Sequence, residues 1–313
     1  MTARAVLAYS LLIRDTGRGY QINYETPKSD PALFVHGDLA YDHLLLLPTR
    51  LKTLGPALTP NILLDFAKHN GNILLALSAD TPTPTSLVSL LLELDIHLSA
   101  DRNALVVDHF NHDTANADDK HDVLLVTPPN ALRADVKNYF SAEGVLAIPR
   151  AVGQVLGNAS PLLAPILKAP ATAYSYNPKE EAEAVEDPFA TGQQLSLISA
   201  MQSRNSARFT VLGSVEMLQD AWFGANVRPS GNDAQSEGLT VPTANREFAK
   251  KLTGWTFQEL GVLKVGRIVH HLNGDDGDAT PANNTAVALT TTDVNPKMYR
   301  IKNDVVCFLP SPC

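Results

Sequence analysis

The strongest constraint on the fold is an alternation of short apolar strands and helical segments early in the chain. Asp42–Leu47 and Asn72–Leu77 are mainly apolar runs, which are typical of strands buried on both faces of a sheet. Between them Leu58–Phe66 has helical spacing, with Thr59 able to cap a helix and Pro60 suited to its first position. These elements predict a β-α-β unit, whose strands lie parallel and are joined by a right-handed crossover.

The same alternation continues further along the chain. Leucines at helical spacing over residues 87–94 predict a second helix with one apolar face. Strands are predicted at Ala104–Val107 and Asp122–Val126, and Leu195–Leu218 contains two core elements joined by the polar turn Gln202–Arg208. The sequence therefore predicts an α/β domain over residues 1–265, with an open, mostly parallel sheet and flanking helices, as in flavodoxin-like folds.

Beyond residue 265 the helical signals end. Alternating and β-branched residues predict strands at Arg267–Leu272, Val287–Thr291 and Tyr299–Phe308. We therefore expect residues 266–313 to form the beginning of an all-β, β-sandwich-like domain, which the end of the sequence at Cys313 cuts short.

Composition excludes some classes of protein. Hydrophobic residues make up 44% of the 313 residues and charged residues 19%, which is typical of a globular chain with a large core. The net charge of −8, without a cluster of Lys and Arg, argues against a nucleic-acid partner. The two cysteines, Cys307 and Cys313, lie too close to the end to form a disulfide framework for the fold.

One polar loop carries side chains that suit a metal ion. Asp108, His109, His112 and Asp113 follow a predicted strand, and His121 is nearby. His and Asp are ligands for zinc or manganese, and ligands bind beyond the carboxyl ends of strands in α/β sheets. No fixed spacing such as H-E-x-x-H is present, so our preferred interpretation is a polar loop. The alternative is a metal-dependent hydrolase or sugar-binding protein that uses residues 108–113.

Other motifs of catalysis are incomplete. Ser214 follows a predicted strand, but the sequence GSVEM lacks the second Gly of a G-x-S-x-G nucleophile elbow, so Ser214 is better interpreted as a helix N-cap. No glycine-rich loop matches a dinucleotide or phosphate fingerprint. We therefore expect no catalytic, cofactor-binding or metal-binding residue in this chain.

Two N-x-S/T triplets are candidate glycosylation sites. They begin at Asn158 and Asn283. Such acceptors are modified when a chain enters the secretory pathway.

Several segments together, in the same order along the chain, resemble one family. The segments that carry the resemblance are Ala40–Pro48, Leu58–Ser78, Val106–Asp113, Lys168–Glu181, Ala200–Leu218 and Arg246–Val265. They resemble the 48 kDa subunit family of oligosaccharyltransferase, the dolichyl-diphosphooligosaccharide–protein glycosyltransferase of the endoplasmic reticulum. The resemblance extends from about Tyr20 to Cys313 and is closest to fungal members.

The resemblance implies a role without catalysis. Family members are accessory, lumenal subunits at the endoplasmic reticulum membrane, and other oligosaccharyltransferase subunits are their partners. The complex transfers an oligosaccharide from dolichyl diphosphate to Asn in N-x-S/T of nascent chains, and the catalytic residues lie in a different subunit. On this interpretation no cofactor is expected, the 108–113 loop is structural, and Arg204 and Arg208 are candidate interface residues.

The ends of the sequence depart from the family pattern. Family members begin with a signal peptide followed by a strand and a helix, whereas Met1–Thr16 matches poorly. They also continue to a C-terminal membrane span. We therefore expect a sequence truncated at both ends, in which the first strand of the sheet is missing or is replaced by Ala3–Ile13.

Overall fold

The computed structural model describes residues 20–26, 31–117, 120–129, 138–178, 187–230 and 240–262, and the backbone of two strands at 269–272 and 305–308. The chain divides into two compact units, residues 1–261 and 262–313. In the described part of the chain, no helix is long and apolar enough to cross a membrane.

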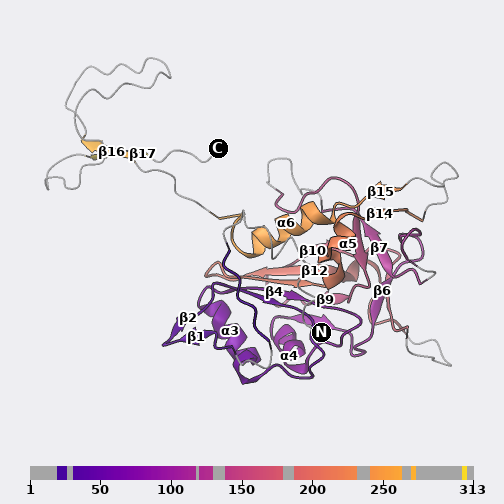
Figure 1. Ribbon diagram of the computed structural model, residues 1–313, viewed down its shortest axis with the longest axis horizontal. Coiled ribbons are helices and arrows are strands. Elements are labelled where there is room, and N and C mark those ends of the chain that lie inside the picture. Colours follow the sequence, from indigo (N-terminus) through magenta and orange to yellow (C-terminus); the bar gives the residue numbers. More distant parts are fainter. Residues whose placement is uncertain are drawn as a thin grey trace, which may run out of the picture. The chain divides into compact units, whose positions relative to one another are not determined.

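The first unit is built on a seven-stranded mixed sheet (Figure 1). The strand order is β3-β4-β13-β12-β9-β5, with β10 also paired to β12. β3, β4 and β13 are parallel, and the other pairings in this sheet are antiparallel. The strands are β3 (His43–Leu46), β4 (Asn72–Ala76), β5 (Ile96–Leu98), β9 (Gln154–Leu156), β10 (Leu163–Lys168), β12 (Leu195–Gln202) and β13 (Arg208–Leu212).

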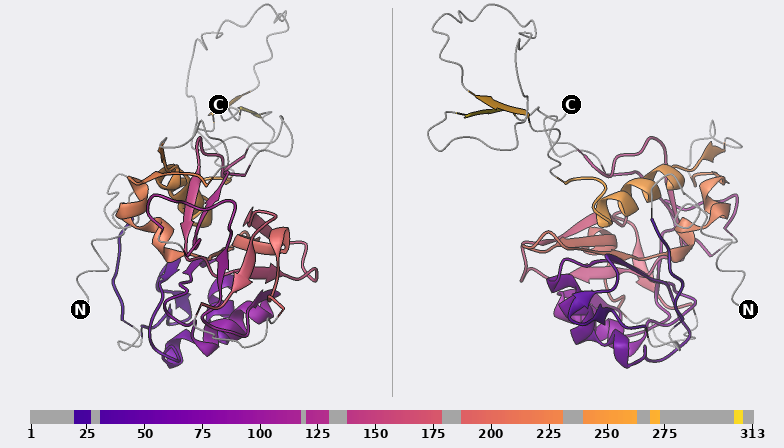
Figure 2. Two further views of the ribbon diagram at one scale, coloured as in Figure 1. Left: turned by 90° about the vertical axis from the view of Figure 1, so that its right-hand side faces the viewer. Right: turned by 60° about the vertical axis from the view of Figure 1, so that its left-hand side comes forward.

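Helices cover both faces of this sheet. Successive side chains of a strand point to opposite faces, so Ile73 and Phe209 pack with α3 (Pro60–Lys68) and α4 (Thr85–Glu93) in one apolar cluster. Leu212 packs in a second cluster with α6 (Asn245–Thr256). In the right-hand view of Figure 2 the purple helices and the orange helix lie on opposite sides of the strands. The predicted α/β class is confirmed.

The predicted β-α-β unit is also confirmed. The Oγ1 atom of Thr59 accepts a hydrogen bond from the backbone N–H of Ile62 at 3.4 Å, and Pro60 begins α3. The helix ends before Gly71, whose N–H donates to the carbonyl of Phe66 at 2.9 Å. A Cβ atom at Gly71 would lie 2.3 Å from the buried Phe66 ring, so this close approach requires glycine. These features depend on neighbouring residues, which explains why the sequence predicts them.

The prediction of a mostly parallel sheet is wrong. β12 and β13 form an antiparallel hairpin, with Gln202 opposite Arg208. A connection this short cannot carry the crossover that parallel neighbours need. The predicted strands at residues 104–107 and 122–126 lie outside the seven-stranded sheet, because β6 pairs with β11 and β7 pairs with β8. An apolar run has the same composition in a parallel or an antiparallel buried strand, so the pattern could not separate them.

Shorter elements complete the first unit. Four two-stranded sheets are formed by β1 (Phe34–Val35) with β2 (Asp38–Leu39), β6 (Leu105–Val107) with β11 (Tyr174–Tyr176), β7 (Val123–Val126) with β8 (Leu146–Pro149), and β14 (Asn226–Val227) with β15 (Val241–Pro242). The short helices are η2 (Pro56–Leu58), η3 (Gly192–Gln194), η4 (Val215–Leu218) and α5 (Asp220–Phe223).

In the second unit the structure describes one antiparallel pair, β16 (Val269–Leu272) with β17 (Val305–Phe308). Both strands fall within the predicted strands Arg267–Leu272 and Tyr299–Phe308. The predicted strand Val287–Thr291 and the candidate acceptor Asn283 lie outside the described residues.

Candidate functional site

The carboxyl ends of the parallel strands are the place where α/β sheets usually bind ligands. Here this position is filled by the proline-rich segment after β4, including Pro82 and Pro84, together with Leu47 and Leu87. The cavity that remains has a volume of about 10 Å³. A single water molecule needs about that much space, so this strand-end crevice has no room for a substrate.

An ion pair lies beside the crevice. Arg150 forms ion pairs with Glu216, with Nη2 2.7 Å from Oε1, and with Asp80, with Nη1 3.0 Å from Oδ2. The Nε atom of Arg150 also donates a hydrogen bond to Glu216. Burial raises the pKa of Glu216 above its ordinary value, although the Arg150 guanidinium acts in the opposite direction. The pair joins the end of β8 to η4, which indicates a structural role.

Ser214 is not a nucleophile in this structure. It is 1% exposed, and its hydroxyl donates to the carbonyl oxygen of Pro149. Ser214 does precede a helix, η4, but its side chain does not cap that helix. The predicted N-cap position is confirmed, but the hydroxyl bonds the Pro149 carbonyl and not a backbone N–H of the helix.

Asp108 stabilises its own turn. Its carboxylate accepts hydrogen bonds from the backbone N–H groups of Phe110 and Asn111, from the Asn111 side chain at 3.0 Å and from the Thr172 hydroxyl at 2.7 Å. The residue is fully buried. Burial acts to raise the pKa of Asp108, but these hydrogen bonds outweigh it and hold the pKa below its ordinary value.

Asp113 repeats the same arrangement one turn later. It accepts from the backbone N–H groups of Ala115 and Asn116, from the Asn116 side chain at 2.7 Å and from the backbone N–H of Arg228 at 2.8 Å. Asp113 is also fully buried. Both carboxylates are therefore occupied by protein donors. Among the residues that the structure describes, no group of three His, Cys, Asp or Glu side chains has the geometry of a metal site. The alternative of a metal centre at residues 108–113 is not supported.

The loop nevertheless gathers three imidazoles, His109, His112 and His121, which we call the three-histidine cluster. The ring centres of His112 and His121 lie 4.1 Å apart, and those of His109 and His121 lie 4.6 Å apart. His109 Nε2 lies 2.9 Å from the hydroxyl of Tyr174 on β11. Burial, followed by the neighbouring His121, lowers the pKa of His112. The cluster thus joins both ends of the loop to β11.

The two arginines proposed as interface residues have different surroundings. Arg208 is 3% exposed, and its guanidinium donates to the carbonyls of Trp255, Leu260 and Gly261. The structure does not support an interface role for Arg208, because this buried guanidinium donates to residues at the end of α6. Arg204 is exposed on the hairpin turn.

Asn205 on the same turn has a role that the sequence did not reveal. Its side-chain amide donates to the carbonyls of Ala67 and Lys68, at 2.9 Å each, at the end of α3. Helix ends leave carbonyl groups without intrahelical partners. Asn205 and Arg208 therefore connect the β12–β13 hairpin to helices on both faces of the sheet.

A larger cavity of about 490 Å³ lies between the residues that follow β7 and strand β10. Such a volume falls within the range of ligand pockets. Among the described residues that line it, Lys168 is the charged one, and prolines contribute much of its wall. A wall of this composition lacks the paired acid and base of general acid–base catalysis. The prolines are Pro128, Pro129, Pro165 and Pro170.

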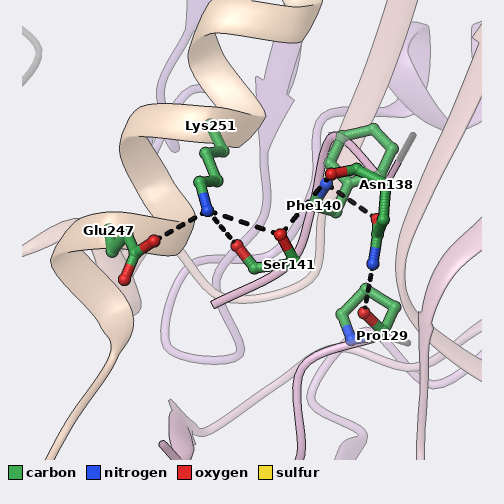
Figure 3. Close-up of polar contacts among 6 residues, drawn as sticks. All are labelled: Pro129, Asn138, Phe140, Ser141, Glu247 and Lys251. Atoms are coloured by element: carbon green, nitrogen blue, oxygen red, sulfur yellow. Dashed lines mark hydrogen bonds and ion pairs between the residues drawn. The ribbon is translucent and has the colours of Figure 1, made fainter. Parts of the chain in front are cut away.

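Polar contacts hold residues 138–141 to Pro129, which lines this cavity, and to α6 (Figure 3). Asn138 donates its side-chain amide to the carbonyl of Pro129 at 2.6 Å, and its own side-chain oxygen accepts from Phe140. Lys251 of α6 donates to the carbonyl of Ser141 and to Glu247 at 2.7 Å. These bonds attach one wall of the cavity to α6.

Asn158 is accessible to solvent. It is exposed in the turn between β9 and β10. The adjacent N–H of Ala159 donates to Asp95 at 2.9 Å, which positions the turn. The second candidate, Asn283, is outside the described residues.

Some buried polar residues were missed by the sequence analysis. Asn245 pairs its side chain with both the N–H and the carbonyl of Ala147, at 2.9 and 2.8 Å. Gln154 is fully buried, where its carbonyl oxygen accepts from Ser199. A polar residue at the start of an apolar run or helix is the signal that could have identified them.

Comparison with known proteins gives one consistent result. A family model described as "OST48, N-terminal domain" matches residues 3–259. The chain is 32% identical over 300 residues, 95% of its length, to the dolichyl-diphosphooligosaccharide–protein glycosyltransferase subunit wbp1 of Schizosaccharomyces pombe, of which it covers 61%. It is 31% identical over 280 residues, 88% of its length, to the corresponding 48 kDa subunit of Danio rerio, of which it covers 59%.

A similar match extends to Caenorhabditis elegans, whose 48 kDa subunit is 31% identical over 262 residues, 82% of this chain and 56% of the relative. The chain thus spans about three-fifths of the length of the curated relatives that it matches. Since the family model covers most of the sequence, including the whole seven-stranded sheet, the chain belongs to the OST48 family and contains its N-terminal domain.

Proposed function

We propose that this chain acts as a non-catalytic subunit of an oligosaccharyltransferase complex, which carries out protein N-glycosylation. The observation that carries the proposal is the similarity over 95% of the chain to a protein named as a subunit of dolichyl-diphosphooligosaccharide–protein glycosyltransferase. Its partners are then the other subunits of the complex. The dolichol-linked oligosaccharide and the nascent polypeptide are contacted through those subunits.

The chemistry of the described residues supports an accessory role. The strand-end crevice has no room for a substrate, and Ser214 and Asp108 are both buried and hydrogen-bonded. The roomier cavity, between β7 and β10, has Lys168 as its charged side chain. Among the described residues that line these two cavities, no acid is paired with a base.

Co-purification tests the proposal. The full-length protein, tagged in its own cells, is purified from detergent-solubilised microsomes and its partners are identified by mass spectrometry. Recovery of other oligosaccharyltransferase subunits in stoichiometric amounts supports the proposal. Recovery of the protein without any of them would overturn it.

Arg204 is the residue that we propose for a subunit contact. It is exposed at the tip of the β12–β13 hairpin, and neighbouring Asn205 holds that tip against α3. Arg204→Ala should therefore weaken co-purification without changing the folded structure. Arg102→Ala, at another exposed turn, serves as the matched control. Equal recovery with both variants would exclude Arg204 from the interface.

We place the protein at the endoplasmic reticulum membrane, with this chain on the lumenal side. The names of the relatives support the compartment, and the exposed Asn158 triplet is compatible with a lumenal position. Glycosylation at Asn158 and Asn283 is part of this proposal.

The domain organisation completes the proposal. The parallel strands β3, β4 and β13, with helices on both faces, support a flavodoxin-like ancestry for residues 1–265. The β16–β17 pair in the second compact unit supports the start of an all-β domain at residues 266–313.

A further inference from the structure

The three-histidine cluster holds two separate segments of the chain together. His109 and His112 follow β6, whereas His121 precedes β7. The Nδ1 atoms of His109 and His121 lie within hydrogen-bond distance of each other, and His109 also reaches Tyr174 on β11. The contact therefore joins the Asp108–Asp113 turn to the start of one strand and to the face of another.

The three-histidine cluster accommodates one added proton more easily than two. A hydrogen bond between His109 and His121 requires one protonated nitrogen and one lone pair, so neutral rings or a single shared proton satisfy it. The ring of His112 packs against His121 with its centre 4.1 Å away. A second positive charge in the cluster would lie against the first, beside the buried ring of His112.

His112 is the ring least able to accept that second proton. The residue is 9% exposed, and its Nδ1 atom is buried without a hydrogen-bond partner among the described residues. A protonated imidazole has two N–H donors, so the Nδ1–H would have no acceptor. Burial first, and then His121, lowers the pKa of His112, although a hydrogen bond with the Asp108 backbone and the charge of Asp108 act in the opposite direction.

Other ionisable groups surround the cluster without providing that acceptor. The carboxylates of the turn are already occupied by several donors each. The groups on the elements packed around the cluster are Asp108, Asp113, Tyr174 and Arg228, and Asp122 follows His121 in the chain.

We propose that the three-histidine cluster is an acid-sensitive latch, which holds the Asp108–Asp113 turn against His121 and β11 at neutral pH and releases it when a second imidazole is protonated. In the released turn His112 is exposed to water and recovers its ordinary pKa of 6.5. Because the pKa in the closed turn is lower, the closed form loses stability as the pH falls below 6.5 and through the lowered value.

Hydrogen exchange measures the opening directly. Amide protection of peptides covering residues 108–117 and 173–177 is compared at pH 7.5 and 5.5 on the purified chain, after correction for the intrinsic exchange rate at each pH. We expect protection of these peptides to fall severalfold at pH 5.5, while peptides from β4 and β13 keep theirs. The His112→Asn variant lacks the buried titrating ring, so in this variant the amide protection of these peptides should be the same at the two pH values.

Two further variants keep the test decisive. His36→Asn changes an exposed histidine in a turn with φ of 54°, a conformation that Asn tolerates, and should behave like the wild type. If His112→Asn does not fold, His109→Asn removes an exposed member of the cluster and should reduce the pH dependence. Wild-type protection that is independent of pH, or a pH dependence that survives the cluster variants, would overturn the latch.

Discussion

The guanidinium of Arg208 lies over the indole of Trp255, with its central carbon 4.6 Å from the ring centre. The same guanidinium donates to the Trp255 carbonyl and to two carbonyls that follow α6. Arg208 is the first residue of β13, and Trp255 lies in the last turn of α6. One buried cation thus joins the central strand to the helix on one face of the sheet.

Arg208→Ala should strongly destabilise the protein, whereas Arg204→Ala should not. The first change leaves three carbonyls near the end of α6 without their donor, at a cost of about 3 kcal/mol in the free energy of unfolding. The second removes an exposed side chain and should cost less than about 0.5 kcal/mol. Urea denaturation followed by circular dichroism measures both. Similar midpoints for the two variants would contradict the buried role of Arg208.

Gly71→Ala should be costly because its new methyl group would meet the Phe66 ring, which is fully buried and cannot move aside. Overpacking of this kind costs about 1–3 kcal/mol. Gly224→Ala is the matched control, since nothing lies within 4 Å of its Cβ position and its φ is −114°. Thermal unfolding of the two variants should show a lower melting temperature for Gly71→Ala alone.

Asp108 should make the protein sensitive to strong acid. Its folded pKa lies below the ordinary value of 3.8, so the stability that it contributes is fully present above pH 3.8 and is lost as the pH falls through the folded value. Asp108→Asn should remove this contribution and lower the unfolding free energy at pH 6 by about 2 kcal/mol. The difference between wild type and variant, measured from pH 6 to pH 2, should shrink as the pH falls. A constant difference would show that the Asp108 charge is not responsible.

Asn158 should carry a glycan when the protein is made in the endoplasmic reticulum. We expect an endoglycosidase-sensitive shift in gel mobility that Asn158→Gln abolishes, measured in an Asn283→Gln background so that one acceptor remains. Ser160→Ala should abolish the same shift and Ser160→Thr should keep it, because either hydroxyl residue completes the acceptor triplet. An unmodified chain in purified microsomes would argue against the lumenal position.

Local chemistry accounts for the parts of the fold that the sequence predicts well. Thr59, Pro60 and Gly71 act on residues within a few positions of themselves, so the boundaries of α3 can be read directly from the chain. The apolar face of α4 follows from leucine spacing in the same way. Strand pairing is different, because β4 and β13 meet across more than a hundred residues.

The candidate site follows the same division. The sequence places Asp108 and Asp113 in a polar loop, and the repeated Asp-x-x-Asn spacing is a signal that each carboxylate bonds its own turn. It does not indicate that Thr172 and Arg228, both distant in sequence, would complete those bonds. The approach of His121 to His112 and His109 likewise depends on how β6, β7 and β11 come together.

The sequence by itself determined the α/β class, the first β-α-β unit and the family, because these depend on local pattern or on ordered similarity. Only the tertiary structure decided that the sheet is mixed, that the carboxylates of the polar loop are occupied, and that Arg208 is buried while Arg204 is exposed. These outcomes require contacts between residues far apart in the chain, such as Arg208 with Trp255, and the free energy of such contacts is not carried by either segment alone.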